Sequence, residues 1–104
     1  MAVARRQVEI MNRLGLHMRA ASQFVILARQ FQSEIRVHCQ GYECNGKSIL
    51  DLTSLAAECG TRLDLEACGL DAVAAVEALA VVVAARFYEN GDSTEAQSGT
   101  EPAP

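Results

Sequence analysis

The sequence predicts an α+β fold in which helices cover one face of an antiparallel sheet. Segments in which apolar and polar residues alternate are interleaved with segments in which apolar residues recur every third or fourth position, in the order β-α-β-β-α-β-α. The third strand follows the second across Gln40-Gly41, a pair suited to a tight hairpin turn, so we expect these two strands to be antiparallel. At 104 residues the chain has room for one domain.

Each element rests on its own pattern of residues. Strands are predicted where apolar and polar residues alternate or where a turn returns the chain, at residues 5–11, 33–39, 42–44 and 62–68. Helices are predicted from three- and four-residue steps, at residues 18–31, 48–55 and 72–87. Ser48 stands at the start of the second of these helices, where its hydroxyl can cap a free backbone N–H. The stripe of the last helix that should face the core is Ala72, Ala75, Val76, Leu79, Val83 and Phe87. Asp71 precedes this helix and is a residue type that commonly caps helix N-termini.

The composition changes near the end of the chain. Residues 91–104 contain no large apolar residue, so they have too little apolar surface to offset the entropy cost of becoming ordered. We expect one folded domain over residues 1–90 and a disordered tail over residues 91–104.

Charge and hydropathy exclude several classes of protein. The chain carries 9 basic and 13 acidic residues, a net charge of -4, whereas nucleic-acid binding and polybasic membrane contact call for a basic surface. No apolar run reaches the roughly 20 residues that a transmembrane helix needs, and the first residues lack the hydrophobic segment of a signal peptide. We therefore expect a cytoplasmic protein that binds neither membrane nor nucleic acid.

The four cysteines do not form a metal or redox motif. Cys39, Cys44, Cys59 and Cys68 include no C-x-x-C pair, so neither a zinc site nor a redox site is indicated. In a reducing cytoplasm such residues are expected to be small buried thiols. We predict no metal and no cofactor.

The residues best placed for chemistry are His17 and Arg19. His17 lies at the N-cap of the helix over residues 18–31, where backbone N–H groups lack partners and the helix dipole favours anions such as phosphate. Imidazole is a nucleophile at neutral pH, and a guanidinium two residues later can contact phosphate oxygens. The pattern fits a reversible phosphohistidine, and it also fits a capping histidine beside a solvated arginine. The second histidine, His38, alternates away from the core and should be solvated.

Several motifs in the chain resemble one protein family. They are Asn12-x-x-Gly15-Leu16-His17-x-Arg19-x-Ala21, Phe24-Val25, Phe31, Gly46-Lys47-Ser48-Ile49-Leu50-x-Leu52 and Gly69-x-Asp71-Ala72. In order and spacing they are similar to the HPr family, the histidine-containing phosphocarriers of the bacterial phosphotransferase system, over about residues 5–88. The resemblance implies an open-faced β-sandwich with a four-stranded antiparallel sheet and three helices on one face.

The resemblance also implies a role for each motif. His17 matches the histidine that accepts phosphate on Nδ1 from phosphoenolpyruvate-charged Enzyme I and passes it to a IIA domain, and Arg19 matches the arginine beside that phosphate. Ser48 matches a serine that an HPr kinase/phosphorylase modifies in some members. The chain would then be a monomeric phosphoryl carrier and not an enzyme, serving either sugar transport or a nitrogen-type regulatory branch. The alternative is an HPr-like regulatory module that docks on partners without being phosphorylated.

The same comparison indicates partner-binding residues and two departures from the family pattern. The residues expected to contact partners are Met18, Ile26, Lys47, Ile49 and Leu50, and the four apolar ones would form a docking patch near His17. Where the family usually has Ala-Arg-Pro after the histidine, this chain has Met18-Arg19-Ala20; alanine is an excellent helix residue, so the helix should still form. Asp51 replaces a small or basic residue and makes the surroundings of Ser48 more acidic.

Overall fold

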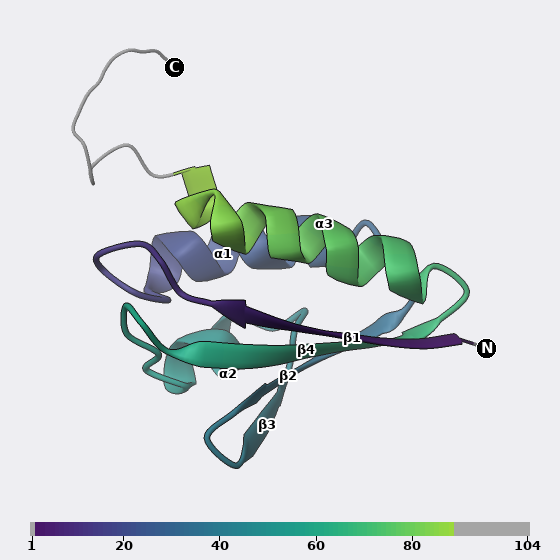
Figure 1. The fold of residues 1–104 in the computed structure, drawn as a ribbon, viewed down its shortest axis with the longest axis horizontal. Coiled ribbons are helices and arrows are strands. Elements are labelled where there is room, and N and C mark those ends of the chain that lie inside the picture. Colours follow the sequence, from purple (N-terminus) through teal and green to yellow (C-terminus); the bar gives the residue numbers. More distant parts are fainter. Residues whose placement is uncertain (1, 89–104) are drawn as a thin grey trace.

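The computed structural model of the chain describes residues 2–88 (Figure 1). Its elements are β1 (Ala2–Glu9), α1 (Met18–Ala28), β2 (Glu34–Cys39), β3 (Tyr42–Asn45), α2 (Ile49–Ser54), β4 (Arg62–Gly69) and α3 (Ala72–Ala84), followed by a 3-10 turn at Arg86–Tyr88. The predicted order of elements is confirmed. None of the described helices is long and apolar enough to cross a membrane. The predicted tail at residues 91–104 and the predicted domain end at residue 90 lie outside the described residues.

The four strands form one antiparallel sheet in the order β1-β4-β2-β3. The first strand of the chain therefore pairs with the last one, and β1 and β3 are the two edges of the sheet. The helices α1 and α3 lie side by side over one face of the sheet (Figure 1), and α2 packs against α1. This arrangement confirms the predicted four-stranded antiparallel sheet with three helices.

The core lies between the sheet and the helices, where the sequence pattern places it. Val37 on β2 and Leu65 on β4 are direct cross-strand partners, and neither is exposed to solvent. Phe24 on α1 packs in the same cluster. The residues of the stripe predicted for α3 are all buried: Ala72, Ala75, Val76, Leu79, Val83 and Phe87. The alternating and helical periodicities therefore identified the buried faces correctly.

The largest boundary differences in the first half of the chain are at the start of β1 and the end of α1, and β1 also ends at Glu9 rather than at residue 11. The strand β1 begins at Ala2 and not at residue 5, because β4 continues to Gly69 and pairs with Ala2. The helix α1 ends at Ala28 rather than Phe31, since the Phe31 N–H donates to the Ala28 carbonyl in a tighter, 3-10 type of bond. Phe31 still packs against the core from this turn.

The last helix is also shorter than predicted, because the backbone after it adopts left-handed dihedral angles. Arg86, Phe87 and Tyr88 have φ values of 57°, 55° and 61°, in the left-handed region that residues other than glycine rarely adopt. This turn brings the Phe87 ring into the core, where only 2% of the residue is exposed. Phe87 is therefore buried by a turn and not by a continuing helix.

Asp71 stands at the N-cap of α3, but its side chain does not cap that helix. Its carboxylate instead accepts hydrogen bonds from the Gln32 N–H (2.8 Å), the Ser33 N–H (2.9 Å) and the Ser33 hydroxyl. These bonds, with that of the Ser33 hydroxyl first, lower the pKa of Asp71. The predicted cap is thus wrong in its side-chain contact, and Asp71 ties the α1–β2 connection to the start of α3.

Candidate functional site

The loop before His17 is fixed by contacts with a distant part of the chain. The Leu16 N–H donates to the Ala57 carbonyl at 2.8 Å, and the Asn12 side-chain amide donates to the Gly15 carbonyl at 2.6 Å. Gly15 has a φ of +76°, and a Cβ atom there would lie 2.5 Å from the Ala57 oxygen. Only glycine permits this close approach, so the loop enters α1 along a defined path.

The segment that holds this loop is itself joined to β1. The Ile10 N–H donates to the Thr61 carbonyl at 2.8 Å, and the Gly60 N–H donates to the Ile10 carbonyl at 2.7 Å. These two bonds extend the pairing of β1 with β4 beyond the ends of both strands. The rigid sheet is in this way connected directly to the loop that carries His17.

His17 is the N-cap of α1, as predicted. Its Nδ1 accepts a hydrogen bond from the Arg19 backbone N–H at 3.3 Å, and its carbonyl accepts one from the Ala21 N–H at 2.8 Å. An Nδ1 that accepts carries no proton, so in this geometry the ring proton is on Nε2. The lone pair of Nδ1 therefore faces the positive end of the helix dipole.

The surroundings of His17 suit an added negative charge. The first turn of α1 contains no acidic residue. The Arg19 side chain is exposed, and among residues 2–88 it forms no hydrogen bond or ion pair, so its guanidinium is available for a ligand. Ala20, at the position of the usual proline, is fully buried, and α1 begins at Met18 as expected. The Arg19 backbone N–H thus lies beside one nucleophilic nitrogen, and the same first turn of α1 carries an exposed guanidinium.

Ser48 is the N-cap of the short helix α2, as its position predicts. Its hydroxyl accepts a hydrogen bond from the Asp51 N–H at 3.2 Å, and the Asp51 carboxylate accepts one from the Asn45 N–H at 3.1 Å. The departure at Asp51 therefore has a structural role: it holds the turn that leads into α2.

Lys47 is anchored on the backbone near the end of α1. Its ammonium group donates to the Phe31 carbonyl at 2.7 Å, while the Arg29 guanidinium donates to the Lys47 carbonyl at 3.3 and 3.4 Å. These bonds connect the loop before α2 to α1. A contact of Lys47 with partners stays a prediction.

Apolar side chains are exposed around the helix that follows His17. Met18 and Ile26 on α1 and Leu50 on α2 are 58%, 59% and 73% exposed, while Ile49 is half-buried and packs against the core. Leu14, in the loop itself, is 71% exposed and was not among the predicted contact residues. Its sequence signal was ambiguous, because a single leucine in a turn carries no periodicity.

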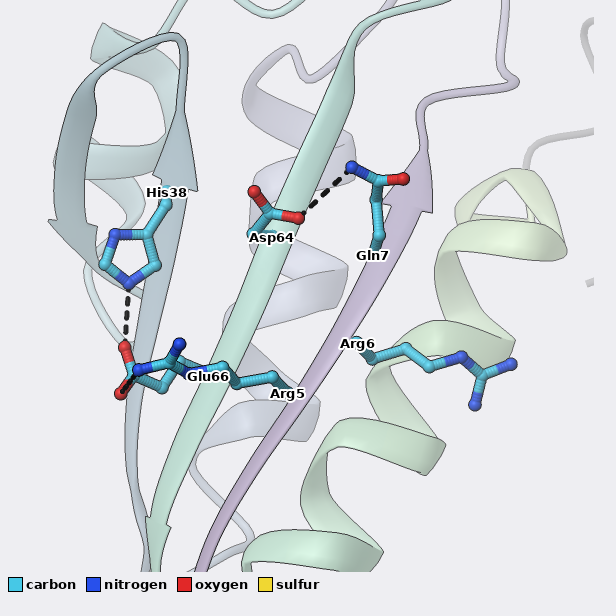
Figure 2. A pocket seen from close by; sticks show the side chains of 6 residues that line it. All are labelled: Arg5, Arg6, Gln7, His38, Asp64 and Glu66. Atoms are coloured by element: carbon cyan, nitrogen blue, oxygen red, sulfur yellow. Dashed lines mark hydrogen bonds and ion pairs between the residues drawn. The ribbon is translucent and has the colours of Figure 1, made fainter.

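His38 lies on the open face of the sheet and is held by two carboxylates. Its Nε2 is 2.8 Å from Glu66 Oε1, and its Nδ1 is 3.8 Å from Glu43 Oε1. Figure 2 shows His38 and Glu66 beside Arg5, which also reaches Glu66. These side chains line a hollow of 570 Å³. The hydrogen bond from His38 is the main cause of a lowered pKa at Glu66. His38 is thus half-buried and paired rather than simply solvated, and it has no helix N-terminus beside it.

The cysteines are free thiols in different environments. Cys39 is buried, Cys44 and Cys68 are half-buried, and Cys59 is exposed, so the expectation of buried thiols is correct only in part. Burial raises the pKa of Cys44 to about 11, which keeps that thiol protonated. Within residues 2–88 no group of three or more histidine, cysteine or acidic residues could hold a metal ion.

The family model described as "PTS HPr component phosphorylation site" matches residues 4–85. The chain belongs to the HPr family. It is 42% identical over 85 residues to the phosphocarrier protein HPr of Neisseria meningitidis, covering 82% of this chain and 96% of that one. It is 40% identical to the phosphocarrier protein NPr of Shewanella violacea, covering 81% and 92%.

Solved structures agree with this membership. An HPr from Thermoanaerobacter tengcongensis superposes with a TM-score of 0.80 at 36% identity, covering 83% of this chain and 97% of that one. As a member of the HPr family, the chain is a phosphocarrier of the phosphotransferase system and not an enzyme. The resemblance found in the sequence is confirmed, and so is the phosphocarrier function.

Proposed function

We propose that His17 is the phosphoryl acceptor of this carrier, receiving phosphate from Enzyme I and passing it to a IIA domain in the cytoplasm. The observation that carries this assignment is the position of Nδ1 at the N-terminus of α1, with its lone pair toward the Arg19 N–H. His38 is the other histidine of the chain, and carboxylates surround it, which would repel a phosphoryl group.

The transfer step follows from this geometry. The Nδ1 lone pair attacks the phosphorus of the donor's phosphoryl group, an N–P bond forms, and the bond between phosphorus and the donor atom breaks. The ring needs no deprotonation at Nδ1, because its proton is already on Nε2. Once phosphorylated, Nδ1 no longer accepts from the Arg19 N–H, and a phosphate oxygen takes that hydrogen bond in its place.

Arg19 supplies the side-chain charge in the proposed site. Its guanidinium can move to the phosphate without breaking an ion pair with another of residues 2–88. A planar guanidinium can contact two phosphate oxygens at once, which gives orientation as well as charge neutralisation.

We propose that the exposed apolar residues near His17 form the surface that both partners use in turn. Met18 and Leu50 expose apolar side chains on neighbouring helices, and Ile26 extends that surface along α1. Ile49 and Lys47 contribute at the edge, where the backbone is fixed by the Lys47 contact with Phe31. A shared apolar surface fits a carrier that must bind a donor and an acceptor transiently.

The test is incubation with Enzyme I and phosphoenolpyruvate, followed by intact-mass measurement. The parent chain should gain one phosphoryl group that is lost in acid and survives base, as expected of an N–P bond. His17→Ala should abolish the gain, and His38→Ala, the matched control, should keep it. Full labelling of His17→Ala would overturn the assignment, and a parent chain that gains nothing would favour the regulatory module that docks without being phosphorylated.

For Ser48 we propose capping of α2 as the main role. Phosphorylation by an HPr kinase/phosphorylase would leave oxygens that can accept from the Asp51 N–H, and it would add a charge of about -1.5 to -2 at the first turn of α2, which already contains the Asp51 carboxylate. Ser48→Asp tests the regulatory alternative. A rate of phosphoryl acceptance within about twofold of the parent supports capping alone, whereas a loss of about tenfold with unchanged Tm would show regulation.

A further inference from the structure

We propose that the groove between β1 and α3 binds an extended peptide segment of a partner protein, which adds a fifth strand to the sheet. The groove has a volume of 370 Å³ and lies on the far side of β1 from β4. Its lining comes from the second half of β1, the start of the loop after it and the end of α3: Arg6, Gln7, Val8, Glu9, Met11, Ala80, Val83 and Ala84.

The backbone of β1 identifies the occupant as an extended chain. Within residues 2–88, β1 pairs with β4 alone, so every second N–H and C=O group of its eight residues points outward without a strand partner. A row of donors and acceptors at this spacing is matched by another strand, and neither a small ligand nor a helix can pair with all of them.

The helix α3 gives the groove a wall and an apolar pocket. Figure 1 shows α3 lying along β1, above the same edge. Half-buried Val8 from β1 and exposed Ala84 from α3 provide the apolar surface, and Val83, which belongs to the core, lines the groove from below. An added strand would place alternate side chains under α3, so one aliphatic side chain opposite Val8 fits the groove.

Charges along β1, beside the groove, indicate the rest of the partner's chemistry. Arg5 and Glu9 lie on the open face of the sheet; Arg5 reaches Glu66 on β4 at 3.4 Å, but its side chain is 76% exposed and so accessible to a second carboxylate. Arg6 points to the other side of β1, toward α3 (Figure 2), and it pairs there with Glu77. Opposite charges facing each other across strands are favourable. The preferred segment therefore has an acidic residue opposite Arg5 and a basic residue opposite Glu9.

The surface is separate from the one proposed for Enzyme I and the IIA domain. The groove lies over β1 and the end of α3, whereas the apolar surface near His17 belongs to α1 and α2. The carrier could thus bind a further protein while its phosphorylation site stays accessible. Binding at the groove does not depend on the assignment of His17.

The test uses a synthetic pentapeptide, acetyl-Lys-Val-Thr-Val-Glu-amide, which in antiparallel orientation places Glu opposite Arg5 and Lys opposite Glu9. Titration into the isotopically labelled full chain should shift backbone amide resonances of residues 5–11 and 80–84, with a Kd of about 0.1–1 mM, a range expected for so short a segment. Absence of shifts there, or shifts confined to α1 and α2, would overturn the proposal.

Two further measurements separate strand addition from simple adhesion. N-methylation of alternate residues gives two peptide isomers, and only the isomer whose methyl groups face β1 should lose affinity, by at least about tenfold. Equal affinities of the two peptide isomers for the chain would overturn the proposal.

Ala84→Gln fills the groove and should weaken peptide binding at least about fivefold, while Ala74→Gln, also exposed on α3 but outside the groove, should not. Equal affinities of these variants would count against the groove.

Discussion

Replacing Gly15 with alanine should cost both stability and phosphoryl acceptance, and the structure gives the size of the first effect. A Cβ atom at Gly15 would lie 2.5 Å from the Ala57 oxygen and 2.9 Å from the Glu58 Cα, and the φ there is +76°. The left-handed conformation alone costs an alanine about 1–2 kcal/mol. Displacing the Ala57 carbonyl loses the bond from the Leu16 N–H, about 0.5–1.5 kcal/mol, and crowding adds about 1–3 kcal/mol. We expect the free energy of unfolding to fall by about 2.5–6.5 kcal/mol, a large part of the stability of a small domain.

Gly41→Ala is the matched control. Gly41 has a similar φ, +87°, but nothing lies within 4 Å of a Cβ atom built there. This variant should therefore lose only the conformational cost of about 1–2 kcal/mol. Urea unfolding followed by circular dichroism measures both losses, and intact mass after reaction with Enzyme I measures acceptance, which should slow only in Gly15→Ala. If the two losses agree within about 0.5 kcal/mol, the reasoning from close packing is refuted.

Three further predictions concern single side chains. Arg19→Ala should slow phosphoryl transfer by about one to two decades, as expected for loss of a charge-assisted contact, with unchanged Tm and partial rescue in Arg19→Lys; equal rates would place Arg19 on the solvated surface. Because the Ser33 hydroxyl and backbone N–H groups lower the pKa of Asp71, its contribution to stability is present above the ordinary carboxyl pKa and is lost as pH falls through the lowered one. Asp71→Asn should flatten the dependence of Tm on acidic pH, and an unchanged dependence would contradict this. Ser48→Ala should lower the free energy of unfolding by about 0.5–2 kcal/mol in a urea titration, since it removes the cap on the Asp51 N–H; no loss would exclude a capping role.

The features that could be predicted from sequence are those with a local cause. Burial repeats with the period of the element, so the stripe of α3 and the inward residues of β2 and β4 could be identified before the structure was known. The N-cap positions of His17 and Ser48 depend only on the residues next to them, and both were correct.

The features that could not be predicted depend on residues far apart in the chain. The Asp71 carboxylate bonds to Gln32 and Ser33, a contact that no local pattern reveals, and a cap on α3 was the natural local alternative. The left-handed turn that buries Phe87 contains no glycine, so the usual signal for positive φ is missing. The Ala57 carbonyl that holds the His17 loop likewise gives no sign in the sequence.

The pairing of β1 with β4 has a consequence for how the site comes into being during synthesis. Residues 2–17 leave the ribosome before residues 57–69, yet β1 finds its only strand partner among residues 2–88 at Arg62–Gly69, and the loop before His17 is held by residues 57–61. Contacts between such distant segments form late in folding, because the intervening chain must first be closed into a loop. The nascent chain therefore contains His17 before residues 57–69 can fix the loop that carries it. Under the proposal that His17 accepts the phosphoryl group, an unfinished chain therefore carries the histidine but cannot position it for transfer until β4 has docked.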